Sequence, residues 1–234
     1  MKLFSCALAA LLAVLAGASQ AAPPFEDSIA QRTLACTACH GSQGRAGPDG
    51  YYPRLAGKPA QYLYHQLLNF RDGRRHYDLM TRLVDPLSED YLLEIARYFS
   101  SLDVPYPPPS SAPADPAALR SGEALALRGD PQRRLPACVQ CHGQTLMGML
   151  PATPGLLGLP RDYLSAQLGA WKTQQRRAHA PDCMARITQQ LSLAELNAVA
   201  TWLAAQPVPA HTRAAAAPTA PLPLECGSAT RAGQ

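Results

Sequence analysis

The residues best suited to chemistry form a Cys-x-x-Cys-His pattern that occurs twice. Each copy contains two cysteines and the histidine that follows them: Cys36, Cys39 and His40, then Cys138, Cys141 and His142. Two thiols at this spacing can bond to the vinyl groups of a porphyrin as thioethers, and the adjacent imidazole can bind the iron. Zinc sites need no histidine directly after each cysteine pair, and no βαβ pattern favours a thioredoxin-like site. We therefore predict two covalently bound haem c groups.

A haem iron with one histidine ligand still has an open face. In an electron carrier a second strong ligand closes that face, so that little moves when the iron changes charge. Met80 lies 40 residues after His40, and Met184 lies 42 residues after His142. Both methionines come just before the last predicted helix of their copy. A thioether favours Fe(II), so this matched placement predicts His/Met ligation and raised potentials at both irons.

Several other residues are weaker candidates for the second ligand. Met147 and Met149 follow His142 by only five and seven residues, which is too few to reach the opposite face of the haem. The remaining histidines do not occupy matching positions in the two copies: His65, His76, His179 and His211. Among these, His76 remains an alternative to the methionine of the first copy.

Cys183 and Cys226 lie outside both haem motifs. In an oxidising compartment two such cysteines suggest a disulfide, which would tie the C-terminal tail to the loop of the second haem. The sequence does not show whether they are close enough to bond. In the alternative interpretation, Cys183 is a thiolate haem ligand in place of Met184.

Pro53 and Pro154 begin the same Pro-x-Leu-x-Gly segment in each copy. Their carbonyl oxygens could accept the Nδ1 proton of His40 and His142, which would orient each imidazole ring and raise its basicity. A proline that only forms a turn is equally compatible with the sequence.

The haem motifs belong to a longer internal repeat. The segment Leu-Ala-Gly-Lys-Pro at 55–59 matches Leu-Leu-Gly-Leu-Pro at 156–160, and Tyr62-Leu63 matches Tyr163-Leu164. These pairs are 101 residues apart, and the haem motifs are 102 apart. Such agreement along a whole segment indicates a duplicated domain.

The repeat and the composition together suggest domain boundaries. We expect a first cytochrome c domain at 22–102, a proline-rich extended linker at 103–116, a second domain at 117–206 and an Ala/Pro-rich tail at 207–234. The tail has the composition of a disordered segment, apart from its cysteine.

Helical patterns dominate both copies. Apolar residues recur at intervals of three and four near 59–70 and 161–171, and short helices are expected to lead into the haem motifs from about 26 and 116. Ser192 with Glu195 forms a capping box before the last helix, and Ser88 begins its counterpart. Alternating patterns of useful length are absent, so we predict an all-α fold.

The N-terminus has the features of a secretory signal. Lys2 precedes an apolar stretch at 3–16, and Ser19 and Ala21 are small residues at the positions that a signal peptidase reads. We predict a signal peptide at 1–21, cleavage after Ala21, and a periplasmic location. The apolar stretch is short for a transmembrane helix.

The distribution of charge does not favour nucleic-acid binding. Residues 22–102 contain nine basic and nine acidic side chains, whereas residues 118–206 contain nine basic and five acidic ones. Haem propionates would offset part of this excess. The remaining difference between the domains could orient the protein toward an acidic redox partner.

These motifs together resemble the cytochrome c4 family. The resemblance covers about residues 26–206, through both haem motifs, the Pro-x-Leu-x-Gly segments and the matched methionines. It implies two class I cytochrome c domains packed about a pseudo-twofold axis, with the haems near the interface. It also implies electron transfer from a quinol-oxidising complex toward a terminal oxidase or another periplasmic acceptor.

The expected function is therefore one-electron transfer, without catalysis. Two alternatives remain open. The chain could be the cytochrome subunit of a periplasmic dehydrogenase or oxidase, with the tail docking to a larger, membrane-bound complex. It could also be a haem enzyme, such as a thiosulfate dehydrogenase or a peroxidase, which would need an open or labile ligand position.

Overall fold

The computed structural model describes residues 26–47, 50–110, 113–218 and 221–229. The predicted signal peptide at 1–21 lies outside the described residues. Within these ranges, none of the helices combines the length and apolar character needed to cross a bilayer.

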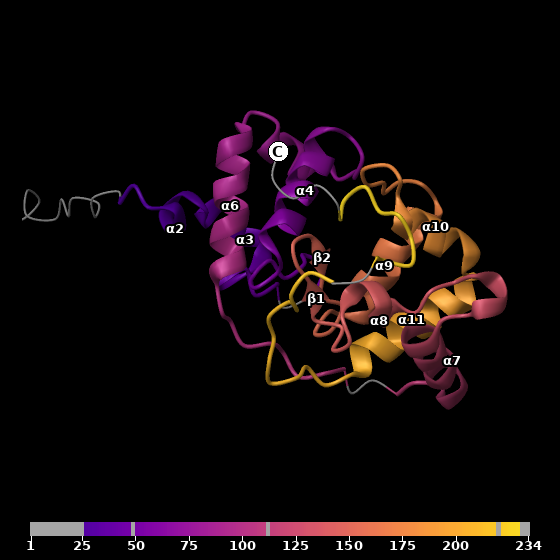
Figure 1. Cartoon of the computed structure of the whole chain (residues 1–234). Coiled ribbons are helices and arrows are strands. Elements are labelled where there is room, and N and C mark those ends of the chain that lie inside the picture. The colour runs from indigo at the N-terminus through magenta and orange to yellow at the C-terminus, as the bar shows by residue number, and fades with distance from the viewer. Residues whose placement is uncertain (1–25, 48–49, 111–112, 219–220, 230–234) are drawn as a thin grey trace, which may run out of the picture.

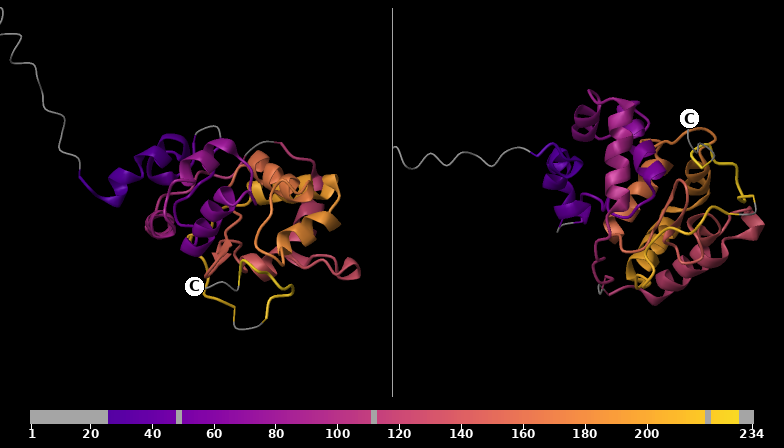
Figure 2. Two further views of the ribbon diagram at one scale, coloured as in Figure 1. Left: turned by 90° about the horizontal axis from the view of Figure 1, so that it is seen from above. Right: turned by 60° about the vertical axis from the view of Figure 1, so that its left-hand side comes forward.

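The chain folds into two helical halves that lie against each other in every view (Figures 1 and 2). The first half, residues 26–102, contains α2 (Ile29–Arg32), α3 (Leu34–His40), the 3-10 helix η1 (Ser42–Gly44), α4 (Ala60–Arg71), α5 (Asp78–Val84) and α6 (Glu89–Ser101). The second half, residues 116–206, contains α7 (Pro116–Arg128), η2 (Pro131–Arg133), α8 (Cys138–His142), α9 (Arg161–Lys172), α10 (Cys183–Gln190) and α11 (Leu193–Ala205). The order of helices after the haem motif is the same in both halves, which confirms the predicted helical, duplicated fold.

The last helix of each half organises its core. In α6, Ser88 accepts a hydrogen bond from the backbone of Tyr91, and Leu92 and Phe99 are buried. In α11, the predicted capping box between Ser192 and Glu195 is present. Helix α6 packs mainly against α4, and α11 packs mainly against α7 and α9. A hydrophobic face on each final helix therefore holds the helices that flank the haem motifs.

The second half also contains a small antiparallel hairpin that the sequence did not predict. Strand β1 (Gly148–Met149) pairs with β2 (Thr153–Pro154). Strands of two residues produce no recognisable alternation, because a period of two needs a longer run to be visible. Gly148 has a φ of 97°, and a Cβ there would lie 2.6 Å from the carbonyl oxygen of Thr153, so this position needs glycine.

The described residues of the proline-rich segment before α7, 103–110 and 113–115, have no regular secondary structure, and the first half holds part of this segment in place. The Arg54 guanidinium donates hydrogen bonds to the carbonyl oxygens of Val104 and Pro105, and it stacks on the Tyr106 ring at 3.8 Å. Further along, the backbone nitrogen of Ser110 donates to the carbonyl of Ala204 in α11. The linker therefore lies along both halves as part of the packed structure.

Candidate haem sites and the interface between them

The two motif histidines occupy the same position in their halves. His40 ends α3 and His142 ends α8, and both side chains are buried. The Nδ1 atom of His40 lies 2.8 Å from the carbonyl oxygen of Pro53, and that of His142 lies 2.8 Å from the carbonyl oxygen of Pro154. The predicted role of the two proline carbonyls is confirmed. With Nδ1 as the donor to a carbonyl, Nε2 is the nitrogen left to bind iron.

The electrostatic environment keeps both imidazoles neutral. Burial lowers the pKa of His40 and of His142, and the hydrogen bond to a proline carbonyl only partly opposes this effect. A neutral imidazole has the free lone pair that a metal requires, so both rings are prepared to act as ligands.

In the first half the four predicted site residues line one cavity. Cys36, Cys39, His40 and Met80 all lie on the wall of a cavity of about 1830 Å³. Pockets for small molecules are usually about 300–1,000 Å³, so this cavity has room for a larger group. Its wall also contains Phe70 and other apolar side chains. These features fit a haem fixed at its edge by two thioethers and covered on its faces by His40 and Met80.

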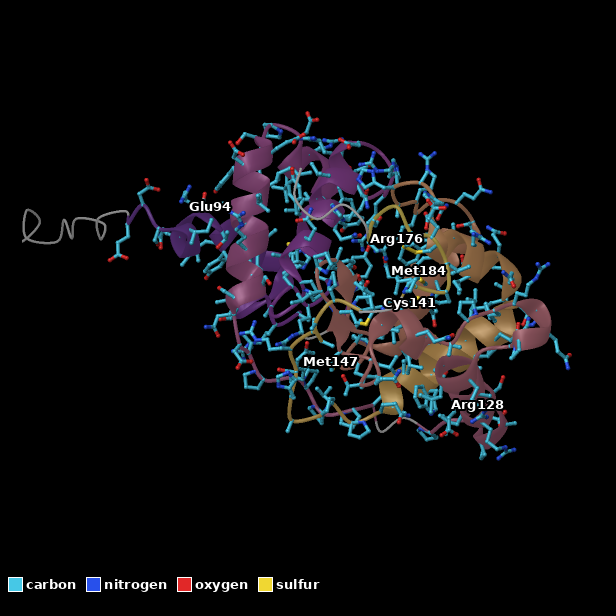
Figure 3. The ribbon with its side chains drawn as sticks, viewed as in Figure 1. Glu94, Arg128, Cys141, Met147, Arg176 and Met184 are labelled. Atoms are coloured by element: carbon cyan, nitrogen blue, oxygen red, sulfur yellow. A yellow bond between two sulfur atoms is a disulfide. The ribbon has the colours of Figure 1, made fainter. Side chains whose placement is uncertain are left out.

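In the second half, the methionine candidates differ in their surroundings. Met147 is 3% exposed and belongs to the hydrophobic core of this half. Met184 lies in α10, and Figure 3 shows it between Arg176 and Cys141, whereas Met147 lies lower in that view. This arrangement agrees with Met184 as the ligand candidate and with Met147 as a core residue.

Among the other histidines, His76 also lies on the wall of the cavity of the first half, whereas His65, His179 and His211 do not line it. The Nε2 atom of His76 lies 3.4 Å from the Asp78 carboxylate, and the imidazole is 76% exposed. His65 and His179 face each other between the halves, with ring centroids 5.6 Å apart, and His211 is exposed. The geometry therefore favours Met80 over His76.

Two of the cysteines outside the motifs, both in the described residues, are joined. Cys183 and Cys226 form a disulfide, with Cα atoms 5.0 Å apart. The predicted bond is confirmed, and the alternative in which Cys183 is a thiolate ligand is wrong, because its sulfur is bonded to Cys226.

Burial disfavours the thiolate form of three motif cysteines before haem is attached. It raises the pKa of Cys138 to about 11, and it also raises the pKa of Cys36 and Cys141. A redox-active or hydrolytic cysteine requires a lowered pKa. The environment of these three residues therefore does not favour a catalytic thiolate, and it is compatible with their use as attachment points.

A symmetric polar cluster connects the halves and forms part of the wall of the same cavity. It contains three pairs of residues, each 101 positions apart: Tyr62 and Tyr163, Gln66 and Gln167, Arg75 and Arg176. Arg75 donates to the side-chain oxygens of Tyr163 and Gln167, at 3.3 and 2.9 Å. Arg176 donates to those of Tyr62 and Gln66, at 3.4 and 2.7 Å. Each arginine thus reaches into the opposite half, which gives the interface a pseudo-twofold character.

The two arginines of this cluster and Lys58 are positively charged, and the groups that accept their hydrogen bonds are neutral. Arg176 is 4% exposed, and burial lowers its pKa. Lys58 is 6% exposed, donates to the Gly155 carbonyl at 3.2 Å, and has its pKa lowered by burial to about 8. Buried cations are costly unless anions approach them. Haem propionates are carboxylates of the required charge, and Arg75 and Arg176 on the cavity wall could receive them.

The sequence alone did not predict the interface role of these residues. The repeat pairs Tyr62 with Tyr163, but Arg75 and Arg176 were not among the predicted functional residues. The signal was present in the repeat, because both arginines are separated by the same 101 positions as the other matched residues. What the repeat could not show is that each side chain crosses to the other half.

Comparison with known proteins gives a consistent result. No protein-family model matches the chain. The thiosulfate dehydrogenase electron acceptor of Thiomonas intermedia is 39% identical over 197 residues, which cover 84% of this chain and 90% of that protein.

Two solved structures are also similar. Cytochrome c4 from Pseudomonas stutzeri has a TM-score of 0.65 at 30% identity, over 79% of this chain and 99% of that one. The thiosulfate dehydrogenase TsdBA from Marichromatium purpuratum has a TM-score of 0.64 at 34% identity; the match covers 74% of this chain but only 36% of that longer polypeptide. The paired haem motifs, the duplicated helices and these similarities place the chain in the cytochrome c4 family, as an electron-transferring cytochrome with two covalently bound haem c groups.

Proposed function

We propose that this chain is a periplasmic electron carrier that accepts electrons from a thiosulfate-oxidising dehydrogenase and delivers them to a respiratory acceptor such as a terminal oxidase. The observation that carries the proposal is the pair of matched haem sites, each with a buried histidine held by a proline carbonyl at 2.8 Å. The choice of donor is supported by the 39% identity with a thiosulfate dehydrogenase electron acceptor.

The proposal includes a ligand for each face of both irons. His40 and Met80 would bind the first iron, and His142 and Met184 the second. Cysteines at 36, 39, 138 and 141 would carry the thioether bonds. Iron with two strong protein ligands has no free position for a substrate, so each haem would exchange electrons only. The haem supplies the change of oxidation state, and the protein supplies ligands, burial and charge.

The proposal also includes the processing and boundaries of the chain. A signal peptide at 1–21 would direct export and leave with cleavage after Ala21. Domains at 22–102 and 117–206, separated by the linker at 103–116 and followed by the tail at 207–234, would each hold one haem. The symmetric cluster around Arg75 and Arg176 lies where the two haem-binding halves meet, which suits electron exchange between them.

The stoichiometry of thiosulfate oxidation suits a dihaem acceptor. When two thiosulfate ions join through a new sulfur–sulfur bond, they form tetrathionate and release two electrons and no proton. A protein with two one-electron centres can take both electrons from one such event. The bond-forming step would take place in the dehydrogenase, and this chain would only be reduced.

A second candidate donor is a quinol-oxidising complex. It is favoured by the similarity to cytochrome c4, which spans 99% of that structure, including both halves. The ligand set and fold required are the same, so the two proposals differ only in the surface that the donor recognises.

An anaerobic reduction assay tests the proposal. The oxidised dihaem protein is mixed with thiosulfate and a purified thiosulfate dehydrogenase, and haem reduction is followed in the visible spectrum. We expect two electrons per protein and no reduction when the dehydrogenase is left out. Parallel mixtures contain a quinol-oxidising complex and its quinol. Faster reduction by the quinol-oxidising complex would replace the proposed donor, and tetrathionate formation by the protein alone would show that it is an enzyme.

A further inference from the structure

The C-terminal tail follows the surface of the second half. In Figure 1 its yellow trace leaves the end of α11, passes β1 and continues beside α10. Its composition suggested disorder, yet three contacts at separate places attach its described residues, 207–218 and 221–229, to the body of the protein.

The first contact joins the tail to the first half. Both terminal nitrogens of the Arg213 guanidinium donate to the last carbonyls of α6, at Ser100 and Ser101, over 2.8 and 3.0 Å. The C-terminal end of a helix carries partial negative charge and unpaired carbonyls, so a cation there is favourable.

The second contact lies on the histidine side of the second haem site. The backbone nitrogen of Ala215 donates to the carbonyl of Gly148, and the nitrogen of Leu150 donates to the carbonyl of Ala215, both over 2.9 Å. The tail thus adds a short parallel pairing to β1. The partner strand of β1 contains Pro154, whose carbonyl fixes the His142 ring.

The third contact lies on the methionine side. Cys226 is bonded to Cys183, the first residue of α10 and the neighbour of Met184. The next tail residue, Gly227, donates from its backbone to the carbonyl of Pro181 over 3.0 Å. A Cβ on Gly227 would lie 2.2 Å from the Ala180 carbonyl oxygen, so the tail turn fits closely on the loop before α10.

The corresponding helix of the first half lacks these attachments. Helix α10 has Asp182 as its cap, which accepts from the backbone of Ala185 at 3.0 Å, whereas the Tyr77 cap of α5 makes no side-chain hydrogen bond to its helix. The residue before Met80 is Leu79, which is 45% exposed and cannot form a disulfide. The repeated fold therefore holds one methionine helix more firmly than the other.

We infer that the tail is a clamp that positions Met184, so that the second haem keeps its methionine ligand under conditions in which the first haem exchanges its own. The inference rests on the proposed ligation of the second iron by Met184. A cross-link at the first turn of α10 removes conformations in which the helix moves away, and local opening is the step that lets a competing ligand reach the iron.

The test measures imidazole binding to the ferric protein. The long-wavelength absorption of Fe(III)–methionine disappears as imidazole replaces each methionine, and Met80→Ala and Met184→Ala assign the changes to the two haems. In the parent protein we expect imidazole to displace Met80 first. In the double variant Cys183→Ser with Cys226→Ser, we expect displacement of Met184 to be faster by roughly tenfold or more, because the cross-link no longer limits movement of α10.

Two further variants separate the clamp from a general loss of stability. Leu79→Ser places serine at the matching position of the first half and should leave the second haem unchanged. Ala215→Pro removes the backbone N–H that donates to the carbonyl of Gly148 and leaves the disulfide intact, so it should give a smaller acceleration at the second haem alone. It also provides the test if the double variant does not fold.

The ligand assignment and the role of the tail can be contradicted separately. A second haem without methionine absorption in the parent protein would show that the ligand assignment is wrong. Methionine absorption that is present, but lost at the same imidazole concentration and rate in the parent, the double variant and Ala215→Pro, would show that the tail does not position Met184.

Discussion

The two halves of the molecule share one side of the haem site and differ on the other. On the histidine side, the distance from Nδ1 to the proline carbonyl is 2.8 Å in both halves. On the methionine side, α10 is capped by Asp182 and cross-linked through Cys183, whereas α5 has neither feature. The contact that orients the histidine is thus common to the repeat, whereas the helix that carries the proposed methionine ligand is held differently in the two copies.

The interface between the halves also contains a residue that differs between the two copies of the repeat. Most of its polar residues occur in matched pairs, but Lys58 occupies the position at which the second copy has Leu159. The Lys58 ammonium donates to the carbonyl of Gly155, the residue after Pro154, which fixes the His142 ring. One unmatched positive charge therefore lies beside the histidine loop of the second haem. Two otherwise similar haems can acquire different potentials in this way.

The largest expected effect comes from replacing one methionine at a time. Met80→His or Met184→His should leave a folded, six-coordinate protein in which the altered haem has a much lower potential. Imidazole is a stronger donor than thioether and stabilises Fe(III), and axial ligands as a group change potentials over roughly 0.8 V. Redox titration followed in the visible spectrum measures both potentials.

The same variants test the carrier function. Electron transfer from the donor to a periplasmic acceptor should fail in each variant, because the altered haem has too low a potential to be reduced by the donor and stays in its Fe(III) state. If either variant instead abolishes turnover of thiosulfate or peroxide by the parent protein, the altered haem is a catalytic centre.

The next effect concerns the symmetric cluster. Arg176→Gln and Arg75→Gln should each destabilise the protein by about 1–3 kcal/mol, because buried acceptors lose their donors. We expect the larger loss for Arg176, which stacks on Trp171 at 3.8 Å, whereas Arg75 stacks on Phe70 at 4.5 Å. Urea unfolding of the haem-loaded proteins gives the two values. A larger loss for Arg75 would reverse this ranking.

A smaller effect should follow from removing the unmatched charge. Lys58→Leu makes the position resemble Leu159 and should lower the potential of the second haem by roughly tens of millivolts, because a positive charge near a haem favours Fe(II). The pKa of Lys58 is lowered to about 8 by burial, so in the parent protein this potential should fall as pH rises past 8. The variant should lose that dependence. An unchanged pH profile would show that Lys58 does not act on the haem.

The smallest effect concerns the caps of the two final helices. Glu195 completes a capping box in α11 and pairs with Arg133 at 2.7 Å, and these contacts lower its pKa to about 2. The counterpart in α6 has only the serine cap. Glu195→Gln should therefore cost about 1 kcal/mol at pH 7, the usual value of a helix cap.

The dependence of this cost on pH has a definite sign. Because the pKa of Glu195 is lower in the folded than in the unfolded protein, its contribution is complete above about pH 4.5 and is lost as pH falls toward 2. Urea unfolding of the variant and the parent at pH 7 and at pH 3 measures the difference. A cost that stays constant between these pH values would contradict the assigned pKa.

Local patterns predicted much of the fold and little of the interface. The haem motifs, the capped helices and the role of the proline carbonyls could be predicted, because each depends on residues that lie close together in the sequence. The hairpin at β1 was missed because its strands have two residues each. Ala215 pairs with Gly148, and Arg176 donates to Gln66. Both contacts depend on how distant segments of the chain pack together, which the periodicity of the sequence does not predict.

The fixed linker has a consequence for the kinetics of the molecule. Arg54 donates hydrogen bonds to the carbonyls of Val104 and Pro105, and the backbone nitrogen of Ser110 donates to the carbonyl of Ala204, so residues 104–110 of the linker are attached to both halves. We therefore expect the separation of the two haem sites to be fixed by the fold. Internal electron exchange should accordingly follow a single exponential whose rate does not depend on solvent viscosity, because no domain has to diffuse before the electron tunnels.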